Sequence, residues 1–174
     1  MKPHKILQPW ILQCFVAIAI CMISFPSTSM SRMGTAAITD SEGIPCFSIP
    51  DDVETSRGLP LQGISVSELP DGRSELPHNV WRLKATNYNS LPTLHPKKCI
   101  QYGENPDGTE HYRLKPLELL KVYSVFINAK HRGSSMMGYS GEFCLKPAGA
   151  GRTTVQVISE DQSLGDARFA ECFK

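Results

Sequence analysis

Alternating apolar and polar residues mark the clearest predicted strand, which runs from Val122 to Ala129. Tyr123, Val125, Ile127 and Ala129 occupy every second position of this segment. Because successive side chains of a strand point to opposite faces of a sheet, these four side chains share one face. The pattern therefore predicts a half-buried strand whose apolar face belongs to the core.

Shorter segments rich in β-branched and aromatic residues lie on both sides of this strand. Turn residues separate them, as at Pro70-Asp71-Gly72. The segments predicted as strands are 45–49, 63–67, 80–84, 98–103, 139–145, 153–158 and the terminal stretch 167–173. Many short strands at this spacing are typical of two packed antiparallel sheets. We therefore expect an all-β fold, a small immunoglobulin-like or fibronectin-like antiparallel β-sandwich.

The start of the strand at 122–129 has a second feature of such sandwiches. Leu117 precedes Tyr123 by six residues, as in the tyrosine corner that joins two strands of immunoglobulin-like domains. The alternative is one helical turn from Leu114 to Leu120, because Leu117 and Leu120 have the spacing of one helix face. In both interpretations Tyr123 is structural.

The first 29 residues are typical of a secretory signal peptide. Lys2 and Lys5 precede an apolar run from Trp10 to Phe25, which is 16 residues long. A membrane-spanning helix needs about 20 apolar residues, so a permanent anchor is disfavoured. Lipidation at Cys21 is disfavoured as well, because the bulky Ile20 precedes that cysteine. We expect a signal peptide over 1–29, a flexible polar tether over 30–43 and one domain over 44–174.

Four cysteines remain in the exported part of the chain, namely Cys46, Cys99, Cys144 and Cys172. An oxidising compartment favours two disulfides, and the wide intervals between these cysteines do not suit a metal site. Four cysteines allow three pairings, and the sequence does not choose among them. We prefer Cys46 with Cys172 and Cys99 with Cys144, because the first bridge would hold the terminal segment against the domain.

Charge and motifs narrow the possible functions. Removing Lys2 and Lys5 leaves 16 basic and 17 acidic residues from the original 18 and 17, a net charge of −1. Basic residues are spread along the chain, which argues against nucleic acid as a partner. The sequence around Ser140 lacks the second glycine of a nucleophile elbow, and the histidines lack metal-ligand spacing. We expect no catalytic residue, metal or cofactor.

Several short motifs follow one another in an order that resembles a known family. They are Cys46-Phe47-Ser48-Ile49, Ile64-Ser65-Val66, the strand with Trp81, Lys98-Cys99-Ile100-Gln101-Tyr102-Gly103, Tyr123 to Ala129 and Glu142-Phe143-Cys144. In this order the chain is similar to the type VI secretion immunity periplasmic lipoproteins of enterobacteria, over most of residues 44–174. The resemblance implies a non-enzymatic periplasmic protein that binds an incoming toxic effector and blocks it.

Such a role requires a contact surface on a rigid scaffold. The predicted contact surface is the connection around His131, Arg132, Met136 and Met137, since methionine and arginine suit protein interfaces. The two methionines packing back on the core is the alternative. Two other functions stay open. One is an accessory subunit of an envelope assembly, and the other is a hydrolase whose residues converge only in the fold.

Overall fold

A computed structural model of the chain describes residues 32–53, 55–70, 76–129 and 136–159, together with Ala170, Cys172 and Phe173. The predicted signal peptide over 1–29 and the candidate lipidation site Cys21 lie outside the described residues. The described ranges contain no helix of the length and apolarity that crossing a membrane requires.

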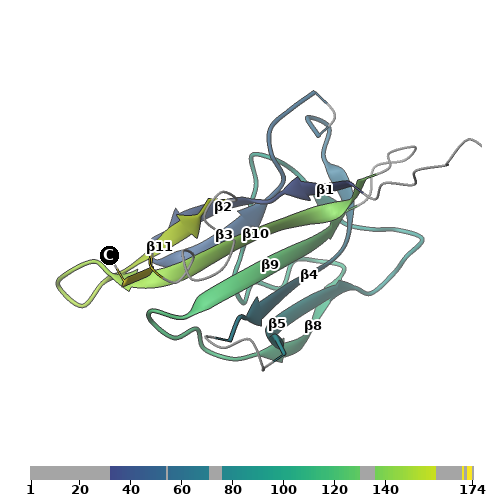
Figure 1. Ribbon diagram of the computed structural model, residues 1–174. Helices are drawn as coiled ribbons and strands as arrows, with labels where there is room; N and C mark the ends of the chain where they lie inside the picture. Colours follow the sequence, from purple (N-terminus) through teal and green to yellow (C-terminus); the bar gives the residue numbers. More distant parts are fainter. Residues whose placement is uncertain are drawn as a thin grey trace, which may run out of the picture. The chain divides into compact units, whose positions relative to one another are not determined.

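The described residues form an all-β fold with two sheets, as the sequence predicts. The long sheet follows the order β1 (Arg32–Thr35), β10 (Met136–Pro147), β9 (Val122–Ala129), β4 (Leu59–Glu68), β5 (His78–Ala85) and β8 (Thr109–Leu114), as Figure 1 shows. Two further strands join it, β11 (Thr153–Ile158) beside β10 and β6 (Thr93–Leu94) beside β4. The small sheet contains β2 (Ala37–Ser41), β3 (Ile44–Ser48) and β7 (Ile100–Gln101). The β1–β10 pair is parallel, whereas the other strand pairs are antiparallel.

One core joins the two sheets. Phe47 on β3 of the small sheet is fully buried, and its ring lies 5.9 Å from that of Trp81 on β5 and 5.6 Å from that of Phe143 on β10. The predicted apolar face of β9 belongs to the same cluster, since Val125 and Ile127 are fully buried. Burying such side chains contributes about 1.5–3 kcal/mol each.

Tyr123 is hydrogen-bonded to the backbone that precedes it, which is the contact expected from the spacing of Leu117 and Tyr123. The backbone N–H of Glu118 donates to the hydroxyl of Tyr123 over 2.9 Å, and Tyr123 is 1% exposed. Burial is the main cause that raises the pKa of this hydroxyl. The alternative helical turn over 114–120 is wrong, because β8 ends at Leu114 and Leu120 has a φ of 61°, outside the right-handed helical region.

The tether predicted over 30–43 is wrong for the residues described. β1 and β2 occupy most of this segment, and Ala36 between them donates its N–H to the carbonyl of Ser140 over 2.8 Å. Ile38 on β2 is 8% exposed and belongs to the core. The segment has few apolar residues, so its own pattern gives a weak signal. Its strands are fixed by backbone pairing with β10 and β3, which no local pattern encodes.

Two disulfides among the four cysteines are present, as predicted, but the preferred pairing is wrong. The bridges join Cys46 to Cys99 and Cys144 to Cys172. Antiparallel pairing of β3 with β7 sets Cys46 opposite Gln101 and brings Cys99 within reach, with 5.4 Å between the two Cα atoms. The terminal cysteine, Cys172, is bonded to Cys144 on β10 and not to Cys46.

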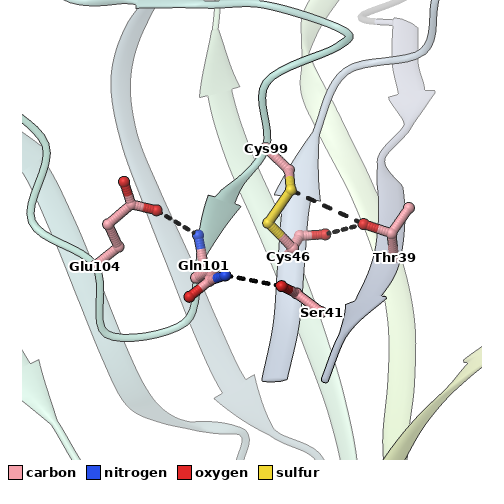
Figure 2. The surroundings of a disulfide bond; sticks show 6 residues. All are labelled: Thr39, Ser41, Cys46, Cys99, Gln101 and Glu104. Carbon is pink, nitrogen blue, oxygen red and sulfur yellow. Dashed lines mark hydrogen bonds between the residues drawn. A yellow bond between two sulfur atoms is a disulfide. The ribbon is translucent and has the colours of Figure 1, made fainter. Parts of the chain in front are cut away.

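Figure 2 shows the Cys46–Cys99 bridge and the side-chain hydrogen bonds that connect the three strands of the small sheet. The hydroxyl of Thr39 on β2 donates to the carbonyl of Cys46 over 3.5 Å. The amide of Gln101 on β7 donates to the hydroxyl of Ser41 over 2.8 Å. Side chains therefore connect β2 with β7 across β3, in addition to the backbone pairing.

Removing each bridge should destabilise the fold, and the bridge that closes the longer loop should have the larger effect. The bridges span 53 and 28 residues, so the loop-entropy relation gives about 4 kcal/mol for Cys46–Cys99 and roughly half a kcal/mol less for Cys144–Cys172. We expect the double variant Cys46→Ser/Cys99→Ser to unfold at a lower urea concentration than Cys144→Ser/Cys172→Ser. Peptide mapping without reduction checks the pairing, and a Cys46–Cys172 peptide would contradict it.

Asp40 joins β2 to β11 at the edge of the two sheets. Its carboxylate accepts hydrogen bonds from the Thr154 hydroxyl over 2.7 Å, from the Val155 N–H over 3.0 Å and from the Gly43 N–H over 2.6 Å. The bond from Thr154, followed by that from Val155, holds the pKa of the Asp40 carboxyl below its ordinary value of 3.8. The ionised carboxylate is therefore the form that the folded protein prefers.

Because its folded-state pKa is lowered, Asp40 stabilises the fold above pH 3.8, and this contribution is lost as the pH falls through the folded-state pKa. We expect Asp40→Asn to lower the free energy of unfolding at pH 7 by about 0.5–1 kcal/mol, a small value because the site is exposed. Urea unfolding at several pH values should show the difference from wild type shrinking below pH 3.8. Asp51→Asn, at an exposed ion pair with Lys97, is the control. A difference that stayed constant into strong acid would contradict this role of Asp40.

Candidate functional site

The contact surface predicted from sequence falls mostly beyond the described part of the chain. His131 and Arg132 lie outside the described residues. The backbone of Met136 and Met137 begins β10, where Met136 is paired with Arg32 of β1. The side chains of both methionines are outside the described part, so this surface stays a prediction.

The described histidines lie apart and have separate structural contacts. His78 on β5 lies 3.2 Å from the carboxylate of Glu68 on β4. His111 on β8 accepts a hydrogen bond from the indole N–H of Trp81 over 2.9 Å, which satisfies a buried donor. In the described ranges, no three His, Cys, Asp or Glu side chains are grouped so that they could hold a metal ion.

An apolar groove lies where the small sheet and the long sheet approach each other near β8. We call it the apolar groove, with a volume of about 530 Å³. It is lined by Gly43, Ile44, Pro45, Tyr102, Gly103, Leu114, Lys115, Pro116, Leu117 and Leu145. Ile44 is 43% exposed and Leu114 is 54% exposed, although both are large aliphatic side chains. Leu119 and Leu120, which are also exposed, meet the groove at Leu145 through a β-bridge and a backbone hydrogen bond.

Tyr102 gives the apolar groove a firm wall. Its ring lies 5.1 Å from the ring of buried Trp81, and its hydroxyl donates to the carbonyl of Lys115 over 2.7 Å. Burial is the main cause that raises the pKa of this hydroxyl. The wall therefore stays neutral and fixed to both sheets. Gly103 beside it has a φ of 85°, a conformation in which a side chain would be strained.

A second concavity lies on the outer face of the long sheet. We call it the outer-face hollow, with a volume of about 140 Å³. It is lined by Gln62, Gly63, Ile64, Ser65, Arg82, Leu83, Lys84, Tyr88, Phe126 and Asn128. In strand register, Gly63 lies between Lys84 and Asn128, and Ser65 lies between Arg82 and Phe126. Small residues on β4 therefore form the floor, and larger residues on β5 and β9 form the walls.

Polar side chains of the outer-face hollow differ from their neighbours on the same face. Nearby, Ser67 donates to Asn79, and Arg113 donates to the carbonyl of Asn79. By contrast, four polar side chains that line the hollow make no hydrogen bond or ion pair within the described part of the chain. They are Gln62, Ser65, Arg82 and Asn128. Their polar groups are available to a ligand.

The strand pattern of the sequence contains a signal for the outer-face hollow. In the strand predicted at 63–67, alternation places Gly63 and Ser65 on one face. In the strand predicted at 80–84, it places Arg82 and Lys84 on one face. Only the pairing of β4 with both β5 and β9 shows that these residues share one face. The apolar groove has no comparable signal, because its residues come from turns and strand ends distant in sequence.

Comparison of the chain with protein-family models, curated proteins and solved structures gives no match. The function of this chain is therefore inferred from its own residues and geometry.

Proposed function

We propose that this chain is an exported, non-enzymatic protein that binds another protein through the apolar groove. The resemblance to type VI secretion immunity proteins suggests the partner, a toxic effector that the chain blocks by occupying its surface. The observation that carries the proposal is the group of exposed aliphatic side chains around the groove, led by Ile44 and Leu114.

Exposed aliphatic side chains at one place favour a protein partner. Monomeric proteins rarely expose large contiguous apolar patches, and such patches often mark contact surfaces. Ile44, Leu114, Leu119 and Leu120 are each more than a third exposed and gather around Leu117 and Leu145. Lys115 adds a polar group beside them, as in the rim of an interface. The matching occupant is an apolar segment of a protein, flanked by polar groups.

The scaffold suits a protein that acts by steric occlusion. The Cys46–Cys99 bridge holds β3, the strand that begins at Ile44. Tyr102, in the wall of the groove, is held by ring contact with Trp81 and by a hydrogen bond to Lys115. A surface that is rigid before binding loses less conformational entropy when the partner binds. Blocking an effector needs this kind of fixed surface and no catalytic group.

Our proposal includes an immunoglobulin-like sandwich and a periplasmic location. The hydrogen bond from Glu118 to Tyr123 and the core shared by Phe47 and Trp81 support such a sandwich. Two disulfides within the chain are compatible with an oxidising, exported compartment. The signal peptide expected over residues 1–29 would direct the chain there.

A role as an accessory subunit of an envelope assembly is the second candidate. β8 is the last strand in the order of the long sheet, and in the described residues it is paired with β5 alone. An unpaired strand edge can accept a strand from another protein. Leu114, at the end of β8, also lines the apolar groove, so a partner strand added to β8 would run past the groove.

The two candidates differ in what the purified, disulfide-bonded protein retains from envelope and secreted fractions of its source. We expect it to retain one protein in stoichiometric amount and to neutralise the toxicity of that protein when both are produced in sensitive cells. Leu114→Glu should reduce retention and protection at least tenfold, because a charge would be buried in the apolar contact.

Leu76→Glu is the matched control, since Leu76 is 87% exposed and does not line the apolar groove. It should retain the partner and protect cells as well as the wild type does. Recovery of envelope subunits without any toxin would favour the accessory role. Equal protection by Leu114→Glu and wild type would show that the apolar groove is not the contact surface.

A further inference from the structure

We propose that the outer-face hollow binds a sugar unit that carries a carboxylate, of the uronic acid class. This site is separate from the apolar groove, so the proposal stands or falls independently of protein binding there. The charge of one wall, the hydrogen-bonding groups of the other residues, and the size and apolar surface of the hollow match such a ligand.

Positive charge on the β5 wall favours an anionic ligand. Arg82 and Lys84 line the hollow, and Arg113 is the register partner of Arg82 on the next strand. Glu110 is paired with Lys84 in the sheet and brings one negative charge, so Arg82, Lys84 and Arg113 still leave these positions with a net positive charge. A guanidinium such as that of Arg82 binds a carboxylate through two parallel hydrogen bonds.

The uncharged polar groups favour a hydroxyl-bearing ligand over a simple acidic side chain. The amides of Gln62 and Asn128 each offer both donors and acceptors, and the hydroxyl of Ser65 does the same. A carboxylate on its own accepts hydrogen bonds only, so it would leave these acceptors unused. The hydroxyls of a sugar donate and accept, and they match the whole set.

The hollow offers room and apolar surface for one face of a sugar ring. Its volume of about 140 Å³ corresponds to roughly four or five water molecules, less than a whole uronic acid occupies, so the rest of the sugar would face solvent. Phe126 on β9 and Tyr88 beyond β5 provide aromatic carbon against which the C–H face of a sugar can pack. The Nζ atom of Lys84 lies 5.6 Å from the centre of the Tyr88 ring, so the cation and the ring lie on the same side of the hollow.

Packing within the sheet keeps the floor of the hollow open. A Cβ atom at Gly63 would lie 2.7 Å from the carbonyl oxygen of Leu83, which is backbone and cannot move aside easily. The close approach of β4 and β5 therefore requires glycine at this position. The hollow follows from the strand packing itself, and its walls supply the recognition groups.

The test is an NMR titration of the purified, disulfide-bonded protein with glucuronate, with glucose and with N-acetyl-glutamate amide. We expect saturable shifts with glucuronate at the backbone amides of Gly63, Ser65 and Asn128, and an affinity at least tenfold higher than for glucose. Glucose lacks the carboxylate, whereas N-acetyl-glutamate amide lacks the sugar hydroxyls. The two comparisons therefore test the cationic wall and the amide groups separately.

Arg82→Gln should reduce the affinity for glucuronate at least tenfold, while Arg152→Gln should leave it unchanged. Arg152 is exposed at the turn between β10 and β11, so the control removes the same charge from another part of the domain. Unshifted amides of β3, which does not line the hollow, show in each variant that the fold is intact. If Arg82→Gln does not fold, Asn128→Ala takes its place, with the same expected loss.

Three results would overturn the proposal. Absence of saturable shifts with glucuronate would mean that the hollow binds no acidic sugar. Equal affinities for glucose and glucuronate would remove the role of Arg82 and Lys84. A higher affinity for N-acetyl-glutamate amide than for glucuronate would identify the hollow as a site for an acidic segment of a protein.

Discussion

Contact between the ring of Phe47 and the rings of Trp81 and Phe143 is the interaction on which the rest of the structure depends. Phe47 brings the small sheet against the centre of the long sheet, and all three residues are fully buried. A three-stranded sheet in which one strand, β7, has only two residues has little independent stability, so it needs this contact and the adjacent Cys46–Cys99 bridge. Placing the small sheet also places the edge of the apolar groove at Ile44.

The two candidate surfaces arise from different consequences of the same sheet geometry. The apolar groove lies where two sheets approach at the end of β8, so its lining combines turn residues with strand ends. The outer-face hollow lies on one sheet, where Gly63 and Ser65 have smaller side chains than their neighbours on β5 and β9. The aliphatic side chains of the apolar groove indicate a protein segment as its ligand. The cations and amides of the outer-face hollow indicate an acidic sugar.

Local signals predict part of this architecture well. Alternation identifies β9 between Val122 and Ala129, and the spacing of Leu117 and Tyr123 predicts the hydrogen bond that closes the corner before it. Signals fail where stability comes from a distant partner. β1 and β2 have few apolar residues, and β8 alternates poorly because several of its side chains are exposed at the edge of the sheet. The candidate contact residues His131 and Arg132 remain a prediction from sequence.

Sequence alone determined the all-β class, the presence of two disulfides and the structural role of Tyr123, because these depend on side-chain period, residue type and short spacing. Tertiary structure alone decided which cysteines pair, since β7 must lie beside β3 before Cys99 reaches Cys46. It also decided that Gly63, Arg82 and Phe126 share one hollow. The physical reason is that strand order and register are set by backbone pairing between distant segments, which leaves little trace in any local pattern.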